Sequence, residues 1–545
     1  MPWSVPPGYR VYPPKVNLCR EVLDRSIENG FGNRVALRFD GGEWTYSDLL
    51  RQVVDVARGM AALGVKRGQP VVLRSPNSPR ACAAMLALFR LGALPVLTSS
   101  LLKAEELDYI LDSSEARFAV AAGTHAEPLQ RFLNEGRLDG LILLDGDTQG
   151  PGVSSWDQLV AMPGAALPDG SPLPYGTALP PGAAQPPAAD TDALEPALLF
   201  YSSGTTGRPK GIVHGHKWII AMGDIVRLQM EYRPGDVVMT QGEYSFMATW
   251  GHCLMAPLAS GATVALYSGR PTPEGVFRSI AAYGVTKFMS VPTFYRTALA
   301  QRELARQFDL SKVEIWVSGG EALGAAPFEQ WQAAFGRPLY DMYGITEMEV
   351  LIGNGPAHPV KPGSLGKAFP GLTWALKDEQ LCDVPRGQPG RFSIHRSDPG
   401  MFLGYHKQPE KWRLAHRGDW YDTGDVMHCD EDGYFWYHGR QDDLFKTRGM
   451  FVSPQEVEDA LIRHPAVAEV AVTGVPDERI GNAVCAFVVL KAAVANRDAL
   501  VAELKATATS RLADYKVPQV VYFVASLPKS MVGKIVRREL APPAD

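Results

Sequence analysis

The chain has 545 residues and a formal net charge of −5, and it is 46% hydrophobic, 21% charged and 9% aromatic. At roughly 100–200 residues per domain it should hold more than one domain, and this composition excludes extensive disorder, collagen and a disulfide scaffold. The slightly acidic balance does not favour a nucleic-acid binder, although one local site can bind a small anion whatever the global charge.

The N-terminal part alternates helical and strand patterns. Apolar residues at helical spacing over 49–63 predict a helix that ends at Gly64. Short apolar runs at 71–73 and 94–97 predict strands on either side of a helix around 83–89. This rhythm is typical of βαβ units, so we expect an α/β fold with a mainly parallel sheet.

A proline-rich run interrupts this pattern. Residues 163–187 contain eight prolines, which is typical of a loop or linker with extended character. Either it separates two domains or it is an excursion on the surface of one domain. The apolar run 197–201 directly after it predicts a buried strand.

The pattern restarts near the C-terminus. Residues 453–456, Ser-Pro-Gln-Glu, form a capping box with proline at the first helical position, which predicts a helix through about Arg463. Strands at 467–472 and 484–490 and a helix near 498–512 should follow. This is a small α+β unit of about 100 residues, long enough to fold as its own domain.

Neither the cysteines nor the N-terminus indicates export. The six cysteines are dispersed with no CxxC pair, so a zinc site or disulfide framework is not expected and a reducing compartment fits. Residues 1–4 lack the pattern of a signal peptide. The most apolar stretch, 81–97, is interrupted by Arg90 and Pro95 and favours a buried helix and strand over a membrane span. We therefore expect a cytoplasmic protein with no membrane span.

The sharpest chemical signal is the loop 201–211, Tyr-Ser-Ser-Gly-Thr-Thr-Gly-Arg-Pro-Lys-Gly. Glycines let backbone N–H groups turn inward around an anion, hydroxyl groups add donors, and Arg208 and Lys210 add positive charge. The loop therefore predicts a phosphate cradle. It is not a Walker A loop, because Pro209 occupies the position of a required glycine.

This loop resembles the signature of the adenylate-forming superfamily, which comprises acyl- and aryl-CoA synthetases, luciferases and adenylation domains. Further segments resemble the superfamily's motifs in the expected order: 318–323 (SGGEAL), 343–347 (YGITE), 421–425 (YDTGD), 439–443 (GRQDD) and 528–534 (PKSMVGK). Within the superfamily the chain is most similar to the benzoate and 2-aminobenzoate CoA ligases, on VNLCREVLDR near the start, on SGGEAL and TEM, and on DDLFKTRGMFVSPQEVE.

The resemblance implies two domains. Residues 1–441 would form a large N-terminal domain of mixed α/β sheets plus a small β-barrel, which binds ATP and the acid. Residues 442–545 would form a small mobile α+β C-terminal domain that carries the catalytic Lys534 and rotates about Asp442. One pose would bring in Lys534, and the other would bring in the loop 446–453, where Lys446 and Gly449 would line a channel for coenzyme A.

The implied reaction joins a small carboxylic acid to coenzyme A in two steps, with ATP and Mg²⁺. The acid would attack the α-phosphorus of ATP to give an acyl-adenylate and pyrophosphate, and a thiol would then displace AMP. The implied catalytic residues are Lys534, Thr206 and Glu347, of which Glu347 follows a glycine turn and could hold Mg²⁺. Asp425 could accept two ribose hydroxyls. The residues expected to bind ATP and AMP are Ser202, Ser203, Gly204, Thr205, Thr206, Gly207, Lys210, Gly320, Glu321, Ala322, Asp341, Met342, Tyr343, Gly344, Thr346, Asp425 and Arg440.

The acid pocket is expected to be aromatic and apolar, so the acid should carry an apolar body. The bulk of Phe246 and Trp250 favours a short pocket over a long acyl tunnel, and the resemblance implies a benzoate-like aryl acid. The expected lining residues are Tyr244, Phe246, Met247, Trp250, Ser318, Gly319, Ile345, Met348 and Val350. The benzoate ligases have small residues near the position of Trp250 and a histidine at that of Val350, which puts simple benzoate in doubt. Glu349 could face an amino group of the acid, but exposure to solvent is favoured.

Several alternatives remain open. The acid could be a medium-chain acid, or a stand-alone adenylation enzyme could load a carrier protein. A luciferase-like oxygenase and a non-catalytic nucleotide binder are disfavoured. His214, His216 and His252 lie near the loop and pocket segments without a metal-ligand partner at suitable spacing, so a structural role is favoured. The expected partners are the acid, ATP and coenzyme A, with no nucleic acid, and the protein is expected to be a monomer or homodimer.

Overall fold

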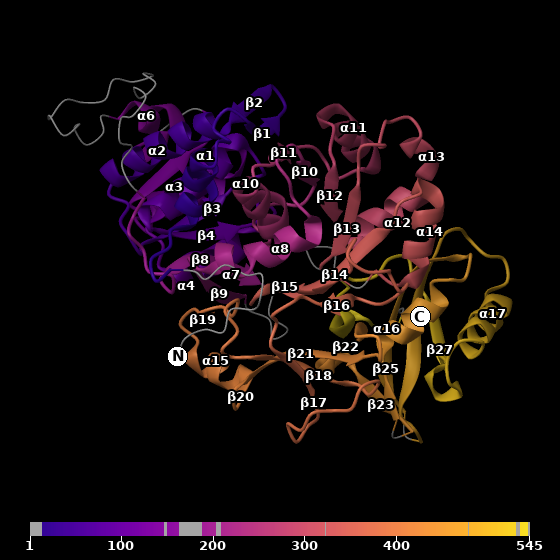
Figure 1. The fold of residues 1–545 in the computed structure, drawn as a ribbon. Coiled ribbons are helices and arrows are strands. Elements are labelled where there is room, and N and C mark those ends of the chain that lie inside the picture. The colour runs from indigo at the N-terminus through magenta and orange to yellow at the C-terminus, as the bar shows by residue number, and fades with distance from the viewer. Residues whose placement is uncertain are drawn as a thin grey trace.

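The computed structural model describes residues 13–146, 150–162, 188–202, 209–321, 323–448, 450–477, 479–529 and 535–542. Figure 1 shows the N-terminal elements at one end of the molecule and the last elements, in yellow, at the other. Two large sheets and the helices around them make up most of this structure. The predicted mixed α/β class with a smaller α+β C-terminal unit is confirmed.

In the described part of the chain, the first sheet has the order β19-β9-β8-β4-β3-β5-β6-β7. From β8 to β7 its neighbouring strands are parallel, whereas β8, β9 and β19 pair antiparallel. The strands are β3 (Pro70–Arg74), β4 (Leu94–Thr98), β5 (Phe118–Ala121), β6 (Gly140–Leu143), β7 (Val153–Ser155), β8 (Pro196–Ser202), β9 (Lys210–Gly215) and β19 (Gly404–Tyr405). β7 and β8, which precede and follow the proline-rich run, belong to this one sheet; the run itself, residues 163–187, lies outside the described residues.

Local sequence explains the first βαβ unit. Helix α2 (Tyr46–Ala62) begins with a capping box between Thr45 and Asp48. Helix α3 (Pro79–Leu91) begins at the cap Ser78 and ends at the left-handed Gly92. The predicted parallel arrangement is confirmed, since α3 joins β3 to its parallel neighbour β4.

The second sheet has the order β17-β18-β21-β22-β16-β15-β14-β13-β12-β10-β11-β1-β2, with β20 paired to β21. Its middle strands are parallel from β14 to β1, and those from β14 to β17 are antiparallel. The strands of the expected small barrel are therefore hydrogen-bonded to this sheet as an antiparallel extension of it. The strands are β1 (Val35–Phe39), β2 (Gly42–Thr45), β10 (Val237–Thr240), β11 (Thr263–Leu266), β12 (Lys287–Ser290), β13 (Ile315–Gly319), β14 (Leu339–Ile345), β15 (Glu349–Gly353), β16 (Gly366–Ala368), β17 (Trp374–Lys377), β18 (Gly390–His395), β20 (His416–Arg417), β21 (Trp420–Cys429) and β22 (Tyr434–Arg440).

The helices that accompany these sheets bury mainly apolar faces. The largest core joins residues of α2, α3, α8 and β8 to residues of the second sheet. The other α-helices of this part are α1 (Arg25–Glu28), α4 (Ala104–Ser114), α5 (Glu127–Asn134), α6 (Trp156–Ala161), α7 (Trp218–Ala221), α8 (Gly223–Met230), α9 (Met247–Trp250), α10 (Ala256–Ala259), α11 (Pro273–Tyr283), α12 (Pro292–Ala300), α13 (Arg302–Ala305), α14 (Ala325–Phe335) and α15 (Pro409–Ala415). No helix in the described ranges is long and apolar enough to cross a membrane.

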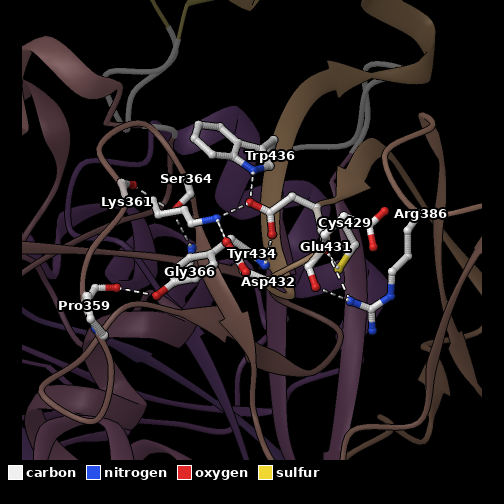
Figure 2. A network of polar contacts seen from close by, with 11 residues as sticks. Pro359, Lys361, Ser364, Gly366, Arg386, Cys429, Glu431, Asp432, Tyr434 and Trp436 are labelled. Atoms are coloured by element: carbon white, nitrogen blue, oxygen red, sulfur yellow. Dashed lines mark hydrogen bonds and ion pairs between the residues drawn. The ribbon is translucent and has the colours of Figure 1, made fainter.

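A polar network fixes the turn between β21 and β22 (Figure 2). The ammonium of Lys361 lies 2.7 Å from Asp430 Oδ2, to which Trp436 Nε1 also donates. Burial raises the pKa of Asp430, but the hydrogen bond from Lys361 and its other donors lower it to about 2. The Lys361 ammonium also lies over the Tyr434 ring, 4.6 Å from its centre. The hairpin is thereby held by a segment far away in the sequence.

The last elements form a unit with its own core. Its strands β25 (Val467–Asp477), β26 (Gly481–Leu490) and β27 (Val520–Phe523) form one sheet, with β23 (Phe445–Thr447) and β24 (Met450–Val452) as a separate pair. Its α-helices are α16 (Pro454–Leu461) and α17 (Arg497–Thr509). Only half of the predicted capping box forms: Ser453 Oγ accepts from the backbone N–H of Glu456, but the Glu456 carboxylate contacts His438 and Lys516 instead. These partners carry positive charge or a ring N–H, so they compete successfully with a backbone amide.

Candidate active site

The predicted phosphate loop is anchored next to the predicted magnesium ligand. Lys210 opens β9, directly opposite Ser202 in the antiparallel pair of β8 and β9. Its ammonium lies 2.5 Å from Glu347 Oε1, and Glu347 is 5% exposed. Burial raises the pKa of Glu347, but the charge of Lys210 and the hydrogen bonds bring it below its usual value. Glu347 is therefore an ionised carboxylate in a buried turn.

Tyr405 and Lys411, which sequence reasoning missed, lie beside Glu347 and Lys210. The Tyr405 hydroxyl donates to Glu347 Oε1 at 2.8 Å and lies 3.0 Å from the Tyr421 hydroxyl. The ammonium groups of Lys210 and Lys411 lie 5.2 Å and 5.5 Å from the centre of the Tyr405 ring. Two cations, one carboxylate and one phenol thus share a small volume, as a polyphosphate and its metal would require.

A second buried carboxylate lies at the end of the β21–β22 hairpin. Asp425 is 2% exposed and accepts hydrogen bonds from Tyr343 at 2.7 Å, from Tyr437 at 2.9 Å and from Arg440 at 3.2 Å. Burial raises the pKa of Asp425, and the charge of Arg440 and the two phenols oppose that rise. The predicted ribose-binding residues Asp425 and Arg440 are therefore brought together with Tyr343, and Tyr437 is a partner that sequence reasoning missed.

A buried oxygen without a hydrogen-bond partner in the described part of the chain is found on two predicted nucleotide-binding residues, Ser202 and Asp341, and on Ser318 from the expected acid pocket. The second carboxylate oxygen of Asp341 accepts from the backbone N–H of Leu323 at 3.1 Å, and burial raises the pKa of this carboxyl to about 7. Unpartnered buried polar atoms are costly, so they fit a site that a polar ligand fills. Gly320, another predicted nucleotide-binding residue, is exposed and has a φ of +94°.

The predicted histidines have structural contacts. Burial lowers the pKa of His214 to about 4, so its neutral ring donates from Nε2 to the carbonyl oxygen of Thr346 at 2.7 Å. This bond fixes the turn that carries Thr346 and Glu347. His216 Nδ1 accepts from the backbone N–H of Leu18 at 3.1 Å. Among the described residues no group of three or more His, Cys, Asp or Glu side chains could hold a metal.

Six of the predicted acid-pocket residues belong to two hydrophobic cores. Tyr244, Met247, Trp250 and Val350 belong to the largest core, whereas Met348 and Ile345 belong to a different core. Trp250 is fully buried, and its ring centre lies 4.4 Å from that of Trp218. Its indole N–H faces the sulfur of Met85 at 3.1 Å. Trp250 therefore packs within the core, and its place on the wall of the acid pocket stays a prediction.

The other expected pocket and nucleotide residues lie around the ends of β13 and β14. Ser318 and Gly319 end β13, and the Met342 side chain covers Gly319. Phe246 precedes α9 and is half-buried. A small cavity contacts Tyr244 from the expected set, together with Asn77, Cys82 and Met85.

Glu349 corrects an interpretation from the sequence. It is not exposed to solvent: the residue is 3% exposed, and its carboxylate contacts the ring of the equally buried His252 at 2.8 Å. A β-bulge between Tyr343 and Gly344 shifts the register of β14 against β15. Such a shift turns side chains to the other face, which alternation in the sequence alone does not reveal.

The remaining predicted residues are either exposed or lie outside the described residues. Asp442 is exposed in a short 3₁₀ turn (Gln441–Asp443), and Lys446 is exposed in β23. The C-terminal loop that should carry the catalytic lysine is flanked by an antiparallel bridge between Lys529 and Ile535. The following predicted residues lie outside the described residues: Ser203, Gly204, Thr205, Thr206, Gly207, Ala322, Gly449 and Lys534.

Comparison with known proteins identifies relatives over nearly the whole chain. The family models "AMP-binding enzyme" and "AMP-binding enzyme C-terminal domain" match residues 23–406 and 456–534. An uncharacterized acyl–CoA ligase of Bacillus subtilis is 34% identical over 97% of this chain and 96% of its own. The benzoate–CoA ligase of Thauera aromatica is 33% identical over 98% of both chains. The crystal structure of an anthranilate CoA ligase with anthranoyl-AMP has a TM-score of 0.86 and 30% identity, with 97% of both chains covered.

Proposed function

Since the chain belongs to the AMP-binding enzyme family of adenylate-forming acid–thiol ligases, we propose that it joins a benzoate-like aryl acid to coenzyme A. Family membership confirms the resemblance drawn from the motifs. It also confirms the enzyme class, an AMP-forming ligase that uses ATP, Mg²⁺ and coenzyme A. The aryl acid and the roles of individual residues are the proposal.

In the first step a carboxylate oxygen of the acid attacks the α-phosphorus of ATP. An acyl O–P bond forms, the bond from this phosphorus to the bridging oxygen breaks, and pyrophosphate leaves. Lys210 and Lys411 would balance the charge of the leaving pyrophosphate, and Asp425 would hold the ribose hydroxyls. Fixed charges of this kind, aimed at developing charge, lower the barrier without rearrangement.

In the second step the thiol sulfur of coenzyme A attacks the carbonyl carbon. The C–O bond to AMP breaks, AMP leaves, and the thiol proton passes to solvent. The chain needs no nucleophile of its own, so positioning and electrostatics supply the catalysis.

A magnesium ion fits the residues on the phosphate side. Mg²⁺ prefers one or two carboxylates together with substrate phosphates over a cage built only by protein. Glu347 supplies one buried, ionised carboxylate, in line with the absence of a larger metal cluster among the described residues. When bound, the ion would neutralise phosphate charge. Lys210, which pairs with Glu347 here, would then turn to the phosphates.

Two geometries would serve the two steps. We infer that residues 442–545 rotate about Asp442, with Lys534 serving adenylation and the loop at Lys446 and Gly449 serving the thiol step. The exposure of Asp442 and the separate core of the C-terminal elements support this inference. Hinges are short segments at element ends that absorb backbone rotation. The cytoplasmic location and the monomeric or homodimeric state stay predictions.

The observation that carries the aryl proposal is the 33% identity to a benzoate–CoA ligase over 98% of both chains. The test is pyrophosphate release from ATP and Mg²⁺ with a panel of aryl and C4–C10 acids, with and without coenzyme A, for the wild type and Lys534→Ala. Aryl-dependent release that coenzyme A accelerates, and that Lys534→Ala abolishes, is expected. Preference for the aliphatic acids would show that the substrate is a medium-chain acid instead of an aryl acid. Pyrophosphate release that coenzyme A does not change would favour a carrier protein as the thiol acceptor.

A further inference from the structure

A buried polar chain runs behind the expected acid site. Glu349 opens β15, and its Oε1 lies 2.8 Å from Nδ1 of His252. Nε2 of His252 lies 3.1 Å from Oε1 of Gln229, whose amide nitrogen donates to the carbonyl oxygen of Asn354 at 3.2 Å. The side chains of Glu349 and His252 are 1% and 0% exposed. The direction of the Gln229 amide makes Nε2 of His252 the donor.

This hydrogen-bonded network ends at the carboxylate of Glu349. Oε2 of Glu349 is buried and has no hydrogen-bond partner in any of the described ranges. Glu349 also has a φ of +92°, a region that residues with a side chain rarely adopt. Backbone strain and an unpartnered carboxyl oxygen each cost free energy, and strain of this kind concentrates at ligand sites.

The open oxygen lies among residues expected to line the acid pocket. Glu349 stands between Met348 and Val350 and pairs with Ile345 across the strands β14 and β15. Its carboxylate rests on Gly251, directly after α9 (Met247–Trp250), so closely that a Cβ on Gly251 would overlap both oxygens. Glu349 thus joins the two segments that the sequence assigns to the acid.

The pair can face an anionic acid because it carries no net charge. Burial raises the pKa of Glu349 well above its usual value and lowers the pKa of His252 to about 3. One proton then lies between Glu349 Oε1 and His252 Nδ1. Whichever of these two atoms holds it, Oε2 remains a hydrogen-bond acceptor.

On these grounds we propose that Oε2 of Glu349 accepts a hydrogen bond from a substituent of the acid, so that the substrate is an aryl acid with an amino or hydroxyl group. This rests on the proposed function and narrows its substrate class. A site built to bond such a group rejects an analogue without it, because the buried acceptor is then left unpaired.

The test compares substrates of one shape. Pyrophosphate release is measured with the 2-, 3- and 4-amino- and hydroxybenzoates and with the corresponding methylbenzoates, whose methyl group fills the same space without a donor. In the wild type, kcat/KM for the best donor acid should exceed that of its methyl analogue by about 10- to 100-fold. A ratio near one would overturn the inference even though the ligase reaction stands.

Two variants give the second arm. Glu349→Leu should bring the ratio close to one, and Glu349→Gln, which keeps an acceptor oxygen in the same shape, should keep most of it. A merely structural role for Glu349 would lower activity with both acids alike and leave the ratio unchanged, which overturns the inference. If Glu349→Leu does not fold, the wild-type ratio still decides. If no acid in the panel releases pyrophosphate, the proposed function itself fails.

Discussion

Glu347 and Glu349 are two residues apart in the sequence but belong to two opposite electrostatic regions. Glu347 lies in the phosphate-side region, where Lys210 and Tyr405 hold it as a carboxylate. Glu349 lies in the buried Glu349–His252 pair, where burial raises its pKa. The same side chain is an anion in one place and a neutral acceptor in the other. Partners from distant strands, not the residue type, decide which.

The largest expected effect lies on the charged side of this comparison. Glu347→Gln keeps the shape of the side chain but removes the charge that would hold Mg²⁺. The rate of acid-dependent pyrophosphate release should fall by about 100-fold. The control is Glu115→Gln, which removes a glutamate from a surface ion pair with Lys407 and should change the rate little. Equal rates for Glu347→Gln and the wild type would show that the ionised state of Glu347 has no catalytic use.

The second prediction concerns Asp425, the other buried carboxylate of the expected nucleotide site. In Asp425→Asn the two phenols and Arg440 lose their charged acceptor, so ribose hydroxyls are held less well. The KM for ATP should rise about 10- to 100-fold with a smaller change in kcat. Asp419→Asn, at an exposed ion pair with Arg396, should leave the KM unchanged. An unchanged KM in Asp425→Asn would remove Asp425 from the nucleotide site.

The two glutamates should respond to pH with opposite signs. A carboxyl whose pKa is lowered by folding, such as Glu347, contributes stability above its unfolded pKa of about 4.3, and this is lost as the pH falls. A carboxyl whose pKa is raised, such as Glu349, contributes stability below that value, and this is lost as the pH rises.

Urea unfolding between pH 3 and pH 7 tests this difference. Relative to the wild type, Glu349→Gln should gain up to about 1.4 kcal/mol of unfolding free energy per pH unit above pH 4.3. Glu347→Gln should instead lose stability relative to the wild type as the pH rises towards about 4.3, and the difference should stay constant above that pH. Parallel slopes for the two variants would abolish the distinction between the regions.

The smallest expected effect concerns the phenol beside Glu347. Tyr405→Phe removes one hydrogen bond to the carboxylate and keeps the ring under both lysines. The rate of pyrophosphate release should fall about 3- to 10-fold. The matched control, Tyr421→Phe, removes only the contact with the Tyr405 hydroxyl and should have less effect. If Tyr421→Phe is the more damaging change, Tyr405 does not position Glu347.

The sequence was sufficient wherever a short segment holds the whole signal. The apolar patterns over 49–63 and around 83–89 predict helices that the structure shows as α2 and α3, and the predicted βαβ unit is confirmed. Lys210 and Glu347 are each singled out by a motif that lies in one loop or turn, whereas the contact between them joins two distant segments. Tyr405 could not be found in this way, because it reaches Glu347 only through the pairing of β19 with β9, from segments almost 200 residues apart.

The acid side shows the opposite limit. An aromatic residue looks the same in a sequence whether it lines a pocket or fills a core, so Trp250 could not be assigned before its contacts with Trp218 and Met85 were known. Glu349 was assigned to solvent because glutamate is rarely buried. That β7 and β8, on either side of the proline-rich run, share one sheet is likewise a property of the fold that composition does not reveal.

The contact between Gly251 and Glu349 also constrains how this site can change over generations. Any side chain at position 251 would collide with the carboxylate, so Gly251→Ala should be harmful alone and tolerated after Glu349→Ala. The two positions are therefore epistatic, and the order of substitutions matters. A lineage, or a laboratory selection, that places a side chain at position 251 must therefore change position 349 first.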